Sequence, residues 1–145
     1  MFSLIYEVTM SRRTARENVY RLTFEFLFYN TKNDTTLDVL LSDSALTNED
    51  KIYITNVYDG IILHFDELKS LVEKYVEGYT IERVYKPDLA VMILCAYELK
   101  YMPEVPAPVA ISEAIEIAER YSSEKSKSFV NGTLSSINKE INGTI

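Results

Sequence analysis

The stretch PDLAVMILCAYELKY, residues 87–101, decides the fold of this chain. Proline suits the first position of a helix and an acidic residue suits its first turn, so Pro87 and Asp88 indicate a helix start. The residues from Leu89 to Leu99 are apolar on nearly every side of that helix. Because a helix that is apolar all round must be covered on all sides, we predict that this one lies at the centre of a helical bundle.

Helical patterns continue toward the C-terminus. Three prolines between residues 103 and 108 predict an extended connection. A helix is expected over residues 109–121, followed by a last helix that Ser123 caps. Phe129 lies about 100° off the apolar stripe of this last helix, one turn above Lys125. The stripe itself consists of Val130, Leu134, Ile137 and Ile141.

Helical patterns also precede the central stretch. Ser11 is the expected N-cap of a first helix that runs to about residue 30, and residues 37–41 predict one or two further turns. Thr47, with Asp50 three residues later, is a variant of the capping box and predicts the next helix. We place a turn near Phe65. No segment alternates as a strand does, so the predicted fold is an all-α bundle of six or seven helices.

The composition limits the number of domains and the class of protein. A chain of 145 residues, 47% of them hydrophobic, is long enough for one buried core and predicts a single domain. The single cysteine, Cys95, excludes an internal disulfide and a cysteine-based zinc site, and it suits a reducing cytoplasm. No apolar run is long enough to predict a membrane span, and residues 1–9 lack the features of a signal peptide.

Basic residues gather at the two ends of an acidic chain. The formal net charge is -7, and residues 31–119 alone hold seven basic and 17 acidic side chains. Arg12, Arg13 and Arg16 stand at the expected start of the first helix, where positive charge opposes the helix dipole. We therefore expect them to face a phosphate or another anion, together with the free N–H groups of the first turn. The alternative is that they are ordinary solvated charges.

Catalytic patterns are sparse. His64 is the only histidine, and its place on an apolar stripe predicts a core residue. No nucleophile motif or glycine-rich phosphate loop accompanies it, and no motif pairs the carboxylates for acid–base chemistry. We therefore expect no enzyme activity, no metal and no cofactor.

Four short motifs follow one another along the chain. They are SRRTARE at residues 11–17, AYEL at 96–99, VP at 105–106 leading to VAISEAIE at 109–116, and FVNG at 129–132. In this order and spacing they resemble the bacterial NusB family of transcription antitermination factors. The family typically starts where Met10 stands here. Residues 1–10 are thus expected to be an N-terminal extension of unknown role, and residues 11–141 a NusB-like domain that binds RNA and protein.

The resemblance implies a fold of two small sub-bundles and a function. The function is binding of the single-stranded boxA element in ribosomal RNA leader transcripts, as a heterodimer with NusE, a small-subunit ribosomal protein. The RNA polymerase antitermination complex is the implied setting, in the cytoplasm. Whether the free protein forms a homodimer stays open.

The resemblance also implies which residues touch RNA. Single-stranded RNA is held by basic groups on its phosphates and by aromatic faces on its unstacked bases. The first group would comprise Arg12, Arg13 and Arg16, and the second would combine Lys125, Phe129 and Tyr121. This arrangement requires the first and last helices to lie side by side. The alternative for Phe129 is that its ring merely completes the core.

Phe24 and Asp88 occupy positions that match the family's contact with the ribosomal protein, and an acidic face suits a basic partner. The alternative for the acidic segment is a solubilising surface.

Three positions depart from the family pattern by losing a basic or polar group, namely Ile93, Ser112 and Glu119. A second function therefore remains open: a protein-interaction module of the same fold with weakened RNA binding.

Overall fold

The computed structural model describes residues 2–76, 78 and 80–143, and within these residues the chain forms seven α-helices, one 3-10 turn and no strand. The elements are α1 (Phe2–Tyr29), α2 (Asp34–Leu41), α3 (Asn48–Leu63), α4 (Phe65–Tyr75), η1 (Ile81–Arg83), α5 (Lys86–Tyr101), α6 (Ala107–Tyr121) and α7 (Glu124–Asn142). The all-α prediction is confirmed.

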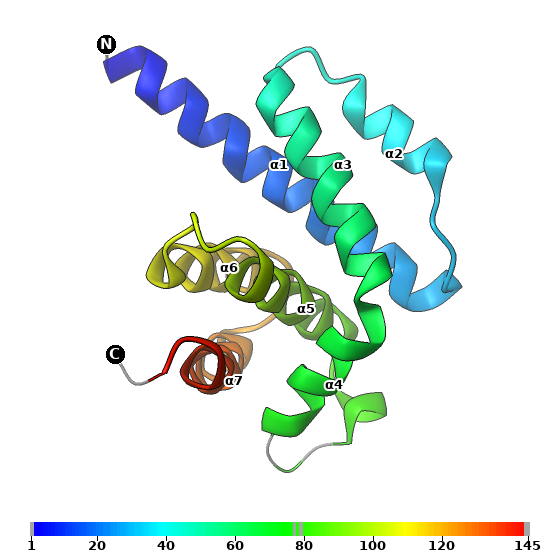
Figure 1. The fold of residues 1–145 in the computed structure, drawn as a ribbon, viewed down its shortest axis with the longest axis vertical. Coiled ribbons are helices and arrows are strands. Elements are labelled where there is room, and N and C mark those ends of the chain that lie inside the picture. The colour runs from blue at the N-terminus through cyan, green and yellow to red at the C-terminus, as the bar shows by residue number, and fades with distance from the viewer. Residues whose placement is uncertain (1, 77, 79, 144–145) are drawn as a thin grey trace.

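The predicted central helix is α5. It packs against α1 and α3 on one side and against α4, α6 and α7 on the other (Figure 1). Every residue from Asp88 to Ala96 is buried, and so are Glu98 and Leu99. Each large apolar side chain covered in this way stabilises the fold by about 1.5–3 kcal/mol. The core of the molecule is therefore assembled around α5.

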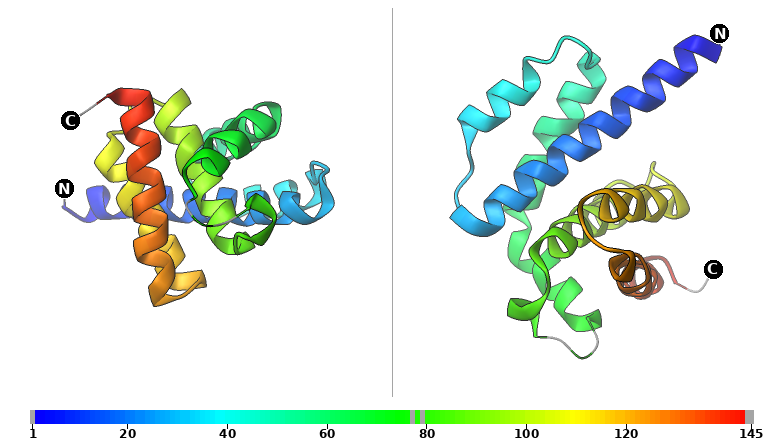
Figure 2. Two further views of the ribbon diagram at one scale, coloured as in Figure 1. Left: turned by 90° about the horizontal axis from the view of Figure 1, so that it is seen from below. Right: turned by 180° about the vertical axis from the view of Figure 1, so that it is seen from behind.

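The helices form two groups, and α5 of the second group packs against the first. Helices α1, α2 and α3 pack on one another, whereas α4, α5, α6 and α7 form the second group (Figure 2). The expected two sub-bundles are thus confirmed. The apolar stripe of α1 faces α3 and α5, and the buried stripe of α7 contains Val130, Leu134 and Ile137.

Several predicted boundaries hold. The Thr47 side chain accepts a hydrogen bond from the backbone N–H of Asp50 (3.1 Å), which is one of the two hydrogen bonds of a capping box, and α3 begins at Asn48. The turn expected near Phe65 falls at His64, which separates α3 from α4. Ser123 stands at the N-cap position of α7 as predicted, but its side chain makes no capping hydrogen bond. Helix α6 begins at Ala107, two residues earlier than expected, because Pro108 is tolerated in the first turn.

The predicted start of the first helix is wrong. Helix α1 already begins at Phe2 and passes through Ser11 without a break, since residues 2–10 contain neither glycine nor proline. The buried Ser11 hydroxyl donates instead to Asp50 at the start of α3. Arg12, Arg13 and Arg16 therefore lie inside a continuous helix, where the backbone N–H groups are already bonded. An anion site built on free N–H groups at this point does not exist.

The expected pairing of the first and last helices is also wrong. Helix α1 packs on α3 and α5, whereas α7 packs on α4, α5 and α6. Helix α6 connects the two, because its side chains contact α1 and its backbone packs along α7. The basic residues of the two chain ends thus meet across α6 and not in a cleft between α1 and α7.

Candidate nucleic-acid interface

The arginines of α1 are held by carboxylates of other helices. Arg12 donates from Nε to Oδ1 of Asp50 (2.7 Å), and its guanidinium lies 4.4 Å from the ring centroid of Tyr53. Arg13 donates from Nε to Oε1 of Glu113 on α6 (3.2 Å). The Arg12 and Arg13 side chains remain 32% and 42% exposed, so both can still reach a ligand on the surface.

Arg16 differs from its two neighbours because it is buried. Its Nε and Nη2 atoms each donate to the Glu98 carboxylate at 2.9 Å, and the two side chains are 6% and 1% exposed. Burial opposes the charge of Arg16, but the hydrogen bonds and charge of Glu98 outweigh it and raise the pKa of Arg16. The expectation that Arg16 faces a ligand is wrong. Arg16 is a structural residue that ties α1 to α5.

Asp50 fixes the position of Arg12. Burial raises the pKa of its carboxyl, but hydrogen bonds from Ser11, Arg12 and Thr47 outweigh burial and hold the pKa below its ordinary value. Asp50 therefore stays ionised at neutral pH. This one carboxylate joins the start of α3 to Ser11 and Arg12 of α1.

A second cluster lies where α1 meets the end of α6. Glu17 accepts hydrogen bonds from Arg120 and from the Tyr121 hydroxyl, and also from Arg21 Nη2 at 3.2 Å. The ring of Tyr121 stacks on that of Tyr20, with centroids 5.3 Å apart. Burial, followed by the neighbouring Tyr121, raises the pKa of Tyr20 to about 12. Tyr121 itself remains 36% exposed at the molecular surface.

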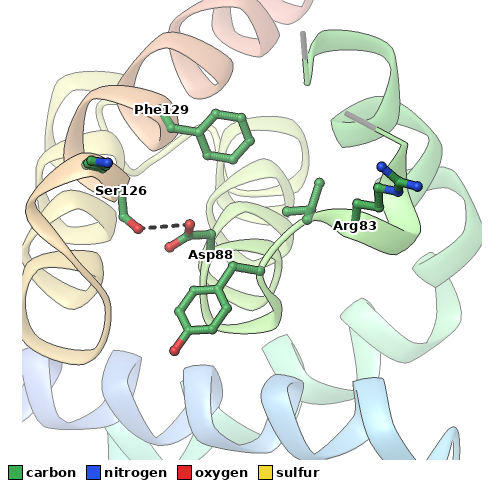
Figure 3. Close-up of a pocket in the computed structure, with 7 residues that line it drawn as sticks. Arg83, Asp88, Ser126 and Phe129 are labelled. Carbon is green, nitrogen blue, oxygen red and sulfur yellow. Dashed lines mark hydrogen bonds between the residues drawn. The ribbon is translucent and has the colours of Figure 1, made fainter. Parts of the chain in front are cut away.

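A third site is a small pocket of about 190 Å³ between η1, the start of α5 and the start of α7. Phe129 and Lys125 line it from α7, and Arg83 lines it from η1 (Figure 3). The Phe129 ring is only partly buried, and its other side lines a neighbouring cavity with Tyr75 and Gly132. Phe129 thus packs against the core and also presents its ring to two surface cavities.

The structure gives Asp88 a structural role. Its Oδ1 accepts from Ser122 (2.8 Å) and its Oδ2 accepts from Ser126 (2.9 Å), as the dashed line in Figure 3 shows for Ser126. The residue is 5% exposed. In this chain by itself the Asp88 carboxylate fastens the start of α7 to α5, and its contact with a partner stays a prediction.

The expected partner residue Phe24 lies in a surface groove that is mostly apolar. Phe24 is partly buried, whereas Phe28 and Tyr85 are 55% and 60% exposed. Arg83, Val84, Lys86 and Pro87 complete the groove, which therefore contains two cations, and the Lys86 ammonium lies 5.5 Å from the Phe28 ring centroid. Sequence reasoning missed Phe28 and Tyr85, because a single exposed aromatic residue has no distinctive pattern.

The three departures from the expected pattern lie in different environments. Ile93 is completely buried in α5. Ser112 is exposed on α6. Glu119 lies 3.5 Å from the Lys127 ammonium, measured from Oε1 to Nζ. The acidic group at position 119 is thus turned toward α7, whereas its neighbour Arg120 reaches α1.

His64 is not a core residue, contrary to expectation. Its side chain is 32% exposed at the junction of α3 and α4, and its ring stacks on Tyr101 with centroids 4.3 Å apart.

In the part of the chain that the structure describes, no three metal-ligating side chains come together. None of the described helices is long and apolar enough to cross a membrane.

Comparison with known proteins places this chain in a family. A family model described as "NusB family" matches residues 9–139. The transcription antitermination protein NusB of Ruminiclostridium cellulolyticum is 35% identical over 130 residues, which is 90% of either chain. The solved structure of T. maritima NusB is 32% identical, covers 89% of this chain and 91% of its own, and has a TM-score of 0.79.

A second solved structure shares the fold at lower identity. It contains the antitermination factors NusB and NusE in complex with dsRNA, and its matching chain is 20% identical with a TM-score of 0.79. The match covers 90% of this chain and 98% of that one. The motifs, the helical architecture and these relatives agree, and the chain belongs to the NusB family, whose matched relatives are transcription antitermination proteins and not enzymes.

Proposed function

We propose that this protein binds the boxA element of ribosomal RNA leader transcripts through residues of its NusB-like domain, residues 11–141. One observation carries the proposal: on an acidic protein, cationic and aromatic side chains that are at least partly exposed stand on α1, at the end of α6 and in the first turns of α7. Arg13 contacts Glu113 in the middle of α6, Tyr121 ends that helix, and Lys125 and Phe129 stand in the first turns of α7. Single-stranded RNA is bound by such a combination of charge and ring faces.

The roles of the individual residues follow from their chemistry. Arg12 and Arg13 hold phosphates. A guanidinium donates from up to five N–H groups, and the contact of Arg12 with Asp50 uses its Nε, while the Arg13 side chain is 42% exposed. Lys125 supplies a third positive charge beside the Phe129 ring. Phe129 and Tyr121 offer faces on which unstacked bases can lie. Arg16 supports this surface from the core through Glu98.

We further propose NusE as the protein partner. A NusB chain of the same fold has been solved with NusE and dsRNA. The apolar groove that contains Phe24, Phe28 and Tyr85 is suited to such a contact, and the acidic charge between residues 31 and 119 suits a basic ribosomal protein. The heterodimer would act within the RNA polymerase antitermination complex, in the cytoplasm.

The test is a titration of labelled boxA-like RNA with the protein alone and with NusE, at several salt concentrations. The proposal predicts tighter binding with NusE. It also predicts that the logarithm of the binding constant falls with the logarithm of the salt concentration with a slope of roughly -2 to -3, from three or four phosphate contacts at about -0.7 each. Arg13→Gln should weaken binding and make the slope shallower.

A different result would favour the second candidate function. The carboxylates on Arg12 and Arg13 favour it, because an ion pair within the protein competes with phosphate. If NusE binds but a scrambled RNA binds as well as boxA at every salt concentration, the protein is an interaction module whose RNA recognition has been lost.

A further inference from the structure

We propose that Arg21 and Arg120 form an additional phosphate site between the two ends of the RNA surface. This inference rests on the proposed RNA binding. It implies that the RNA strand runs from α1 across the end of α6 to α7. The two arginines come from sequence positions 99 residues apart and converge on Glu17.

Exposure and hydrogen bonding fit this role. The Arg21 and Arg120 side chains are 54% and 51% exposed, whereas the Glu17 side chain between them is only 17% exposed. Glu17 accepts from Nη2 of Arg21 and from Nη1 of Arg120. Since a guanidinium carries five N–H donors, each fork retains donors for a phosphate oxygen while Glu17 fixes its direction.

The charge balance of the cluster is positive. Two guanidinium groups meet one carboxylate, which leaves a net charge of about +1 beside a tyrosine ring. Tyr121 is fixed there by its hydrogen bond to Glu17 and by stacking on Tyr20. A phosphate at the two arginines would therefore place the adjoining base near the exposed part of the Tyr121 ring.

The site also bears on the acidic residue at position 119. Glu119 turns toward Lys127, and Arg120 carries positive charge to the α1 side of the same helix end. The end of α6 thus presents a cation to the proposed RNA path in spite of Glu119. We infer that Arg120 supplies the phosphate contact at this end of α6.

The experiment measures boxA-like RNA binding by Arg21→Gln, Arg120→Gln and the double variant between 0.1 M and 1 M salt. Each lost phosphate contact should make the log–log slope about 0.7 less negative, which corresponds to about a five-fold weaker affinity at 0.1 M salt and no loss near 1 M. Arg120→Lys keeps the charge and should keep the slope.

The matched control is Lys139→Gln, which removes one exposed positive charge from the last turn of α7, about 21 Å along the helix from Lys125. If Arg21→Gln and Arg120→Gln behave like Lys139→Gln while Arg13→Gln loses affinity, this additional site is wrong and the proposed function stands. If the unaltered protein does not prefer boxA-like RNA at all, the proposed function itself fails. Helical content should be unchanged in each variant. Thermal unfolding should change little in the single variants, because the side chains of Arg21, Arg120 and Lys139 are exposed and an exposed ion pair contributes about 0–1 kcal/mol.

Discussion

The substitution Glu98→Gln should strongly destabilise this protein. Glu98 accepts two hydrogen bonds of 2.9 Å from Arg16 and one of 3.3 Å from the Tyr53 hydroxyl, and its side chain is 1% exposed. Glutamine removes the negative charge, turns one oxygen into an N–H₂ donor and leaves the Arg16 cation buried without a counter-charge. Breaking a buried ion pair in this way costs about 3–5 kcal/mol.

That cost is large compared with the stability of a domain, which is about 5–15 kcal/mol. At roughly 2–4 °C per kcal/mol, the Tm should fall by about 6–20 °C. The measurement is thermal and urea unfolding followed by far-UV circular dichroism. Glu116→Gln on α6 is the control, since it makes the same chemical change in a side chain that is only partly buried. A loss below about 1 kcal/mol for Glu98→Gln would show that the pair is not desolvated, contrary to the structure.

The double variant Arg16→Met, Glu98→Leu separates structure from RNA binding. Replacing both members of a buried pair by apolar residues of similar volume is often neutral for stability, so most of the lost stability should return. If Arg16 only supports the fold, this variant also keeps its affinity for boxA-like RNA. A folded double variant that loses as much affinity as Arg13→Gln would show that Arg16 touches RNA after all.

Three further variants test other parts of the structure. Asp50→Asn should cost about 1–3 kcal/mol at pH 7, because Ser11, Arg12 and Thr47 all donate to this carboxylate. Since folding lowers the pKa of Asp50, its contribution is present above the ordinary carboxyl pKa and is lost as the pH falls through the folded pKa. Urea unfolding at pH 7 and at about pH 3 should therefore show a smaller acid loss for the variant than for the parent, and equal losses would refute this. Gly60→Ala should cost about 1–3 kcal/mol, because the outer end of the Tyr97 ring occupies the place of the new methyl group and must move; an unchanged Tm would show that the ring moves aside at no cost. Phe129→Ala should weaken RNA binding by about 1–3 kcal/mol without changing the salt slope, whereas Lys125→Gln should make the slope about 0.7 less negative. Equal slopes for these two variants would show that the lysine makes no phosphate contact.

Much of the fold could be predicted from local patterns. The all-round apolar character of residues 89–99 predicted the central helix, since only a position in the middle of the bundle covers every side of it. The capping chemistry of Thr47 depends on residues three positions apart, so it too was visible in the chain. The start of α1 was not, because Ser11 is equally suited to a cap and to a tertiary hydrogen bond.

The candidate site was predictable in part only. Arg12, Arg13, Tyr121, Lys125 and Phe129 were identified by their type and motif, and the structure leaves all five at least partly exposed. Residue type could not separate Arg16 from its neighbours, since the difference lies in Glu98, 82 residues away. Likewise, Asp88 has the chemistry of a partner contact, yet two serines of the α6–α7 region use its carboxylate.

The sequence by itself determined that this protein is an all-α bundle built around residues 87–101, and its motifs indicated the family. These properties depend on periodicity and on short spacings, which the chain carries in one dimension. Only the tertiary structure decided which charged side chains are buried in ion pairs within the protein and which remain exposed at its surface. Ion pairs such as Arg16–Glu98 and clusters such as Glu17 with Arg21 and Arg120 join distant positions, and the energy of a charge depends on burial and on its partners in space.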